Sequence, residues 1–123
     1  MYWKSDDTVI DEIRNEVRSI DNELESISRV SKELRNLEEE NNHQTQKRLK
    51  ELDTISDYWQ GPQADQYINQ SIDAGKAYQK EFARENEYTL MDLETKAGHL
   101  VRKRENLNQE IEKIRNKEGI NGG

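Results

Sequence analysis

The stretch from Asp57 to Ala64 reads Asp-Tyr-Trp-Gln-Gly-Pro-Gln-Ala, and it decides the fold of this chain. It contains the strongest helix-breaking pair in the interior, Gly61 and Pro62. Pro62 suits the first position of a helix because its missing N–H would be unpaired there anyway. Gly61 can take backbone angles that a side chain would forbid. The stretch therefore predicts a first helix that ends near Tyr58, a turn over residues 59–62, and a second helix that starts at Pro62.

Apolar residues before this turn follow a heptad pattern. They recur in alternating steps of three and four, as in a coiled-coil seam, at Ile10, Ile13, Val17, Ile20, Leu24 and Ile27. Val30, Leu34 and Leu37 come after a further step of three, which predicts a shift of the seam around the helix. Ser5 and the acidic residues after it predict an N-cap and an acidic first turn. The first helix is therefore expected over about residues 6–58.

The chain after the turn carries a second apolar pattern. Its members are Ala64, Tyr67, Ile68, Ile72, Tyr78, Phe82, Leu93, Ala97, Leu100, Leu107, Ile111 and Ile114. Arg104 occupies one seam position of the last group. Gly119, Gly122 and Gly123 are expected to end the helix, which would then run over about residues 62–117.

Two long helices joined by so short a turn predict an all-α fold. We expect one domain over residues 1–123, a long antiparallel helical hairpin with coiled-coil-like packing. With the turn near Gln60, Ile10 should lie near Ile111 and Ile13 near Leu107. The two heptad stretches would then face each other, which makes the hairpin self-consistent.

The predicted pairing contains one mismatch. Residues 38–48 include no apolar side chain, and they would lie opposite residues 73–83, where small and aromatic residues gather. Unmatched apolar surface usually marks an interaction site, so we predict a docking surface for a partner helix at Ile72, Tyr78 and Phe82. The alternative is that the two aromatic rings pack on the alkyl stems of lysine and arginine.

Composition excludes several classes of protein. Hydrophobic residues make up 31% of the chain and charged residues 37%, which is typical of long helices. Disorder is the rival interpretation of so polar a chain, and the apolar periodicity argues against it.

The net charge of −7 and the absence of a basic block argue against a nucleic-acid partner. No stretch approaches the ~20 apolar residues of a membrane span, and Met1 to Thr8 has no apolar region typical of an ordinary signal peptide.

Chemistry-bearing residues do not form a pattern typical of an enzyme. The chain has no cysteine, and His43 and His99 have no second histidine one turn away, so no metal site or cofactor is expected. No glycine-rich phosphate loop or nucleophile with a base can be identified. A two-helix hairpin also cannot build a catalytic pocket alone. We predict a protein that binds other helices and is not an enzyme, with a purely structural coiled-coil tether or scaffold as the alternative.

Four residues at the turn form a motif with a structural role. Trp59 can fold across the first turn of the second helix, where Ala64 is small and Tyr67 bulky. Gly61 is expected to let the two backbones approach closely. Trp-x-Gly at the bend of a helical hairpin, with an aromatic residue eight positions after the tryptophan, resembles the WXG-type (ESX-like) proteins of type VII secretion. The motif covers about residues 49–82, and the architecture covers the whole chain.

The chain departs from the usual WXG-type pattern because it is longer at the open end of the hairpin. In this respect it is similar to the accessory proteins encoded beside LXG-domain toxins in Gram-positive bacteria. The resemblance implies a chaperone or targeting factor that binds the helical N-terminal domain of such a toxin, or a second small helical protein, as a homo- or hetero-oligomer. It also implies a protein that is cytoplasmic before export and is secreted by the type VII system.

The family's export signal, Tyr-x-x-x-Asp/Glu, has two matches in letters. Tyr88 and Asp92 form one of them, within the second predicted helix, and Tyr2 and Asp6 form the other. With 5 tyrosines and 26 acidic residues in 123, about one match is expected by chance. The resemblance makes Tyr88 and Asp92 candidates for an export signal, and a solvated helical face is the alternative.

Overall fold

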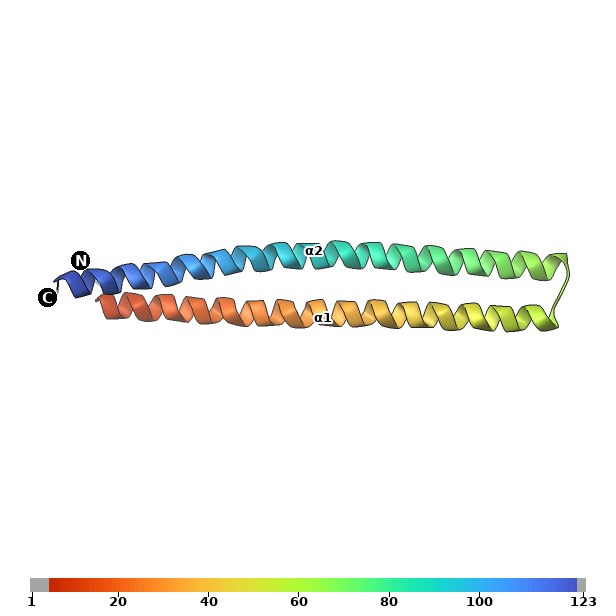
Figure 1. Cartoon of the computed structure of the whole chain (residues 1–123), viewed down its shortest axis with the longest axis horizontal. Helices are drawn as coiled ribbons and strands as arrows, with labels where there is room; N and C mark the ends of the chain where they lie inside the picture. The colour runs from red at the N-terminus through yellow and green to blue at the C-terminus, as the bar shows by residue number, and fades with distance from the viewer. Residues whose placement is uncertain (1–4, 122–123) are drawn as a thin grey trace. The chain divides into compact units, whose positions relative to one another are not determined.

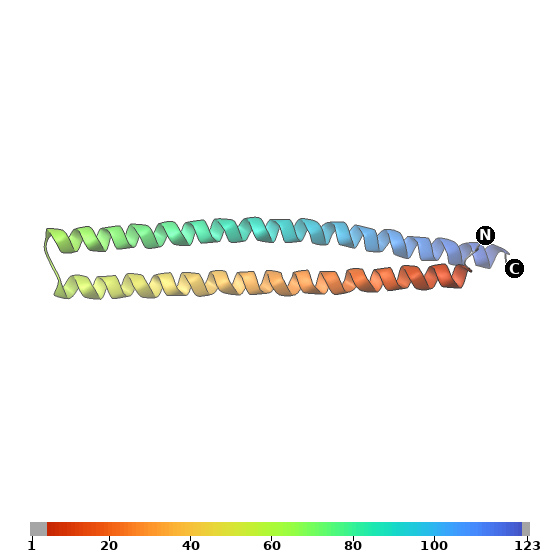
Figure 2. The ribbon, with the colours of Figure 1, turned by 180° about the vertical axis from the view of Figure 1, so that it is seen from behind.

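The chain forms two long helices with a short connection between them. The structure, a computed structural model, describes the backbone of residues 5–121 and the side chains of residues 5–117. Helix α1 spans Asp6–Tyr58 and helix α2 spans Pro62–Asn121. The chain reverses direction between them (Figures 1 and 2), and the two helices pack against each other in an antiparallel hairpin. The predicted all-α hairpin is confirmed.

The start of α1 is fixed by a side-chain cap. The backbone N–H of Thr8 donates to the hydroxyl of Ser5 at 3.2 Å, and the two side-chain hydroxyls lie 2.8 Å apart. A cap of this kind satisfies one of the N–H groups that the first helical turn leaves unpaired. Asp6 and Asp7 follow in the first turn, where their negative charge meets the positive end of the helix dipole.

The end of α2 differs from the sequence prediction. The helix continues through Asn121, about one turn beyond the expected end, and its backbone includes Gly119. A single glycine costs a helix only about 1 kcal/mol relative to alanine, so it does not by itself end a helix. The other two glycines of the predicted stop signal, Gly122 and Gly123, lie outside the described residues.

Contacts within the chain fall into two compact units, which we describe separately. Unit 1 combines Met1–Val30 with Asp92–Gly123. Its core is an apolar cluster of Ile10, Ile13 and Ile111, with partly buried Val9, Val17, Leu107 and Ile114 packed against it. Ile111 and Leu107, the predicted neighbours of Ile10 and Ile13 on α2, therefore lie in the same core as these two residues. Burial of such aliphatic side chains contributes about 1.5–3 kcal/mol each.

Polar side chains flank the core of unit 1. Lys103 forms an ion pair with Glu16 at 3.2 Å, and Arg104 forms one with Asp21 at 2.8 Å. Arg104 is half-buried at its seam position and reaches outward to the carboxylate. Because all four side chains are about a third exposed or more, each pair contributes at most about 1 kcal/mol.

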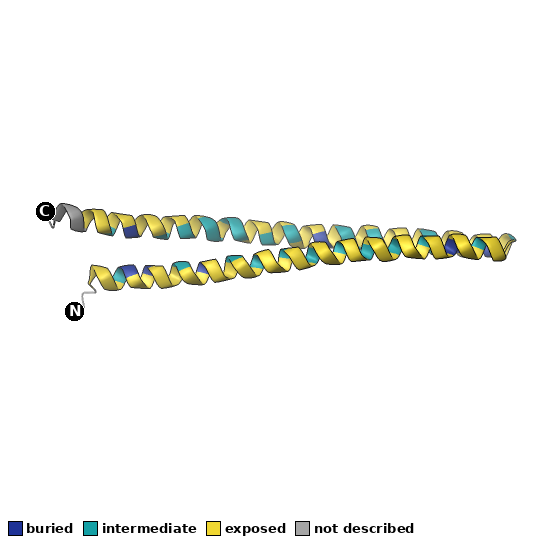
Figure 3. Cartoon of the chain, turned by 60° about the horizontal axis from the view of Figure 1, so that its bottom comes forward, coloured by how far each residue is buried: buried dark blue, intermediate teal, exposed yellow. Residues whose placement is uncertain are grey.

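Unit 2 is the segment Ser31–Met91, which contains the turn. Its buried residues are Leu52, Ala64, Ile68 and Asn86. In Figure 3, exposed residues cover most of both helices, and buried or half-buried residues recur along each of them. Among the residues that the structure describes, no helical stretch is both long enough and apolar enough to cross a membrane.

The heptad seam of α1 does not shift at Val30, which corrects the sequence prediction. The half-buried positions that follow Ile27 as far as Thr45 are Ser31, Leu34, Glu38, Asn41 and Thr45, so the steps of four and three continue unchanged over this stretch, and a second step of four then leads to Leu49. Val30 and Leu37 are instead 41% and 49% exposed. The polar residues Ser31 and Glu38 therefore take seam positions, and the apolar residues Val30 and Leu37 lie beside them.

Candidate interaction site

The turn between the helices depends on the backbone of Gly61. Its φ of 124° is disfavoured for residues with a side chain, and it is the only positive φ among the described residues. The N–H of Trp59 donates to the carbonyl of Ile55, and the N–H of Asp65 donates to the carbonyl of Gly61, both at 2.9 Å. These bonds close the last turn of α1 and the first turn of α2. The chain can therefore reverse here with its backbone groups paired.

The side chains of the turn motif pack on one another. The rings of Trp59 and Tyr67 have centroids 5.6 Å apart and planes inclined by 49°, a tilted aromatic pair. Ala64 is completely buried in the first turn of α2. The two rings remain 44% and 52% exposed. Trp59 therefore packs on the start of α2 and also leaves aromatic surface exposed.

Gly61 serves the turn by its backbone angle and not by close approach. A Cβ placed on this residue would meet no atom within 4 Å. The expected close approach of the two backbones at this glycine is therefore wrong. The three residues that connect the helices leave room around Gly61, and its positive φ is the reason that a side chain is disfavoured.

The middle of unit 2 has a polar seam. Glu38, Asn41 and Thr45 take half-buried positions on α1 where unit 1 has aliphatic side chains. The amide of Gln79 donates to the side-chain oxygen of Asn42 at 2.6 Å, which places the two predicted segments opposite each other. Each residue here contributes less apolar burial than a leucine or isoleucine would. This part of the hairpin is therefore held together by polar contacts.

Asn86 provides the most buried polar contact of unit 2. It is only 7% exposed, and its side-chain N–H donates to the backbone carbonyl of Leu34 at 2.8 Å. A buried asparagine in a seam fixes the register of two helices, because any slip leaves its amide unpaired. Sequence analysis missed this residue. The heptad spacing around it, continued through polar positions, was the signal that could have found it.

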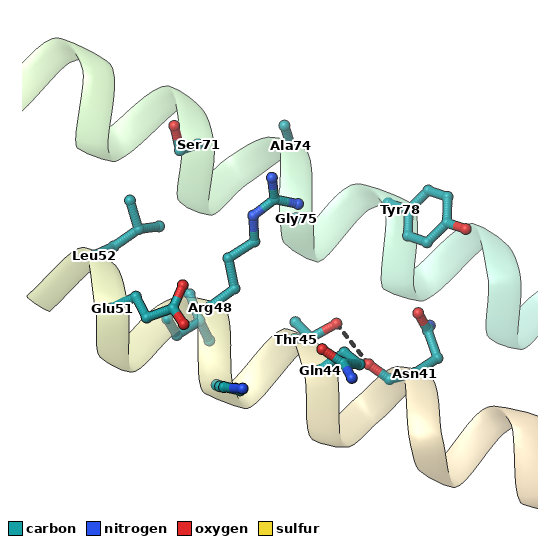
Figure 4. A pocket seen from close by; sticks show the side chains of 12 residues that line it. Asn41, Gln44, Thr45, Arg48, Glu51, Leu52, Ser71, Ala74, Gly75 and Tyr78 are labelled. Atoms are coloured by element: carbon teal, nitrogen blue, oxygen red, sulfur yellow. Dashed lines mark hydrogen bonds between the residues drawn. The ribbon is translucent and has the colours of Figure 1, made fainter.

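A groove lies between the helices beside this polar seam. Its volume is about 710 Å³. It is lined by Asn41, Gln44, Thr45, Lys47, Arg48, Leu49, Glu51 and Leu52 of α1 and by Ser71, Ala74, Gly75 and Tyr78 of α2. Figure 4 shows the Arg48 side chain extending from α1 toward α2. Polar and apolar residues both line the groove, and the side-chain nitrogen of Asn41 is buried without a hydrogen-bond partner.

The three predicted partner-binding residues do not share one exposed face. Tyr78 is 63% exposed and lines the groove. Phe82 is half-buried in the seam, and its ring stacks on that of Tyr78 with a centroid distance of 6.4 Å and an interplanar angle of 28°. Ile72 is also half-buried, but it lies about 120° around the helix from Tyr78 at 100° per residue. Tyr78 is therefore the member best placed to meet a partner.

The two residues of the candidate export signal are surface residues of α2. Tyr88 is 60% exposed, and Asp92 is exposed as well. Both lie within the helix, as the sequence predicted. Of the second match in letters, Tyr2 lies outside the described residues.

Residues with metal-binding chemistry do not gather in the part of the chain that the structure describes. No group of three or more histidine, aspartate or glutamate side chains there could hold a metal ion. His43 and His99 are both exposed, and the nearest polar contact of His99 is Arg102 at 3.4 Å. The described surface therefore offers helix faces and a groove as its candidate functional features.

Comparison of the chain with models of protein families finds no match. Comparison with curated proteins finds none either. Comparison with solved structures also finds no match. The likeness to WXG-type proteins consequently depends on the residues of the turn and on the helical hairpin.

Proposed function

We propose that this chain is a non-catalytic accessory factor that binds the helical N-terminal domain of an LXG-type toxin or another WXG-type protein and accompanies it to a type VII secretion machine. The observation that carries the proposal is the turn. Trp59, Gly61, Ala64 and Tyr67 have the family's spacing, and they lie at the bend of a helical hairpin.

The mechanism of binding would be helix-on-helix packing. The polar seam of unit 2 leaves Tyr78 largely exposed beside a groove, and Trp59 and Tyr67 add aromatic surface at the turn. Tyrosine and tryptophan are enriched among the residues that dominate binding energy in interfaces. An amphipathic partner helix laid along this part of the hairpin would cover them.

Co-expression tests the proposal directly. The full chain is produced with the helical N-terminal domain of an LXG-type toxin, and the complex is isolated through a tag on the toxin domain. We expect a stable complex, and we expect Tyr78→Glu to weaken it at least tenfold. His43→Ala, an exposed change on the opposing helix, serves as the control. A toxin domain that purifies without the chain, although both are folded, would contradict the proposal.

A purely structural tether is the second candidate, and the heptad core of unit 1 favours it. Ile10, Ile13 and Ile111 pack as in an ordinary antiparallel coiled coil, which needs no secretion partner. In the same co-expression experiment this function predicts self-association only. The two candidates are therefore separated by whether the toxin domain binds.

A further inference from the structure

The groove of unit 2 lies where the heptad spacing is interrupted on both helices. Two steps of four follow each other over residues 41–49 of α1, and the same occurs over residues 71–79 of α2. The half-buried residues at these positions are Asn41, Thr45 and Leu49 on α1 and Ser71, Gly75 and Gln79 on α2. Two successive steps of four, in place of alternating three and four, form a stutter, which locally unwinds a coiled coil. We call these two stretches together the stutter segment.

The two stutters face each other. By the register that the bond from Gln79 to Asn42 fixes, residues 45–49 of α1 lie opposite residues 72–76 of α2. Both stretches line the groove of about 710 Å³, and in Figure 4 Thr45 and Gly75 border it from the two helices. A space of this size indicates that the seam side chains do not interdigitate here as they do in a regular coiled coil.

The side chains of the stutter segment hold the two helices together weakly. The hydroxyl of Thr45 donates to the carbonyl of Asn41 on its own helix at 2.9 Å, so this bond does not join the helices. The buried side-chain nitrogen of Asn41 has no hydrogen-bond partner, which is unfavourable for the closed seam. Gly75 contributes no side chain, and an added Cβ would meet no atom within 4 Å. The bond between Gln79 and Asn42 is exposed, so water competes for both groups.

The stretches on either side of the stutter segment are better packed. On one side Asn86 is buried and donates to the carbonyl of Leu34 at 2.8 Å. A second stutter of α2 is centred on Asn86, but α1 keeps its heptad spacing opposite it. On the side of the turn, Leu52 and Ile68 are buried. A weakly held stretch between two better packed ones can open while the rest of the fold stays closed.

We propose that the two helices separate locally and reversibly at the stutter segment, while the contact of Asn86 with Leu34 and the buried residues beside the turn remain in place. In the closed form Leu49 and Ile72 are half-buried, and opening exposes both to solvent. The stutter segment therefore controls when apolar seam surface of unit 2 becomes accessible. Opening is a property of the chain alone, so it does not depend on the proposed function.

Hydrogen exchange of the full chain, resolved by residue with NMR, tests the local opening. Each opening lets the N–H groups of the stutter segment exchange with solvent. We expect protection factors at residues 45–49 and 72–79 to be about tenfold lower, or more, than at residues 13–24 of unit 1 and residues 67–70 beside the turn. Protection as high in the stutter segment as in unit 1 would overturn the proposal. So would protection that falls steadily toward the turn, because that pattern is fraying from one end.

One substitution that makes the seam apolar provides a matched comparison. Asn41→Leu replaces the unpartnered amide at a half-buried position, whereas His43→Leu adds the same side chain two residues away at an exposed position. A gain in helix propensity acts on α1 in both variants, so α2 reports the packing between the helices. We expect Asn41→Leu to raise protection at residues 72–79 about fivefold or more, and His43→Leu to change it less than about twofold. Equal responses of residues 72–79 to the two variants would overturn the proposal.

Thiol labelling measures access to the seam itself. The chain has no cysteine, so one introduced cysteine reports alone. Thr45→Cys and Val17→Cys replace β-branched side chains of similar size at half-buried seam positions, one in the stutter segment and one in unit 1. We expect the first variant to react with a thiol reagent about tenfold faster or more, with equal helix content by circular dichroism. Equal rates would contradict local opening.

These three measurements separate the opening from the proposed function. Each of them uses the chain without any partner, whereas co-expression with a toxin domain tests binding. A chain that opens at the stutter segment but binds no toxin domain would refute only the proposed function. A chain that binds the toxin domain but is uniformly protected would refute only the opening.

Discussion

Alanine substitutions at two glycines should change stability in opposite directions. Gly61 and Gly98 both have open space, because an added Cβ would meet no atom within 4 Å at either position. They differ in backbone conformation. Gly61 has a φ of 124°, whereas Gly98 lies inside α2. Gly61→Ala should therefore lower the free energy of unfolding, and Gly98→Ala should raise it.

The magnitudes follow from the backbone alone. A residue with a side chain held at a sparsely populated positive φ costs about 1–3 kcal/mol. Alanine in place of glycine within a helix gains about 0.5–1 kcal/mol, because the unfolded chain loses less entropy on folding. With a urea m-value of about 2 kcal/mol/M, a loss of about 2 kcal/mol lowers the unfolding midpoint by about 1 M. The helical substitution should raise the midpoint by about 0.3–0.5 M on the same scale.

Urea unfolding monitored by the helical circular dichroism signal measures both effects at one protein concentration. The original chain and the two variants are compared under identical conditions. If Gly61→Ala leaves the midpoint unchanged, the turn does not need its positive φ. If both substitutions shift the midpoint in the same direction, the reasoning from backbone conformation is refuted for this chain.

Two further predictions concern the cores of the two units. Ile13→Ala should reduce the free energy of unfolding by about 2–4 kcal/mol, because Ile13 is only 8% exposed. Val30→Ala, at a position 41% exposed, should reduce it by less than about 1 kcal/mol. Equal losses for the two variants in a thermal or urea titration would indicate that Val30 lies in the seam after all. Asn86→Ala should lower the free energy of unfolding by about 1 kcal/mol, because its hydrogen bond to the Leu34 carbonyl is lost. Asn86→Leu should keep or raise the free energy of unfolding, but it should make the register of the two helices less specific. Cysteine crosslinking between α1 and α2 would detect the loss of register as alternative pairings.

Local backbone chemistry made the helix boundaries predictable from the sequence. The ends at Tyr58 and Pro62 follow from Gly61 and Pro62, and the start at Asp6 follows from the cap at Ser5. These signals act within one turn of the chain, so they need no information about distant contacts. The end of α2 was missed because a glycine such as Gly119 is only a weak stop.

The phase of the seam was not predictable from apolar residues alone. Val30 and Leu37 continue an apolar pattern in the sequence, but the packed helices place Ser31 and Glu38 inward instead. The aliphatic core of unit 1 sets a register whose loss would cost several buried side chains. Placing a few polar residues at seam positions further along α1 costs less free energy than the loss of those buried side chains would.

The sequence by itself determined that the chain is helical, where each helix begins, and which residues form the turn, because capping, proline and glycine geometry are local properties of the backbone. Only the tertiary structure decided which flank of the hairpin carries exposed Tyr78, that Asn86 is buried, and that a groove opens beside Gly75. Those features depend on how far each helix is rotated about its own axis. That rotation is set by the packing of both helices together, which the order of residues along one helix does not contain.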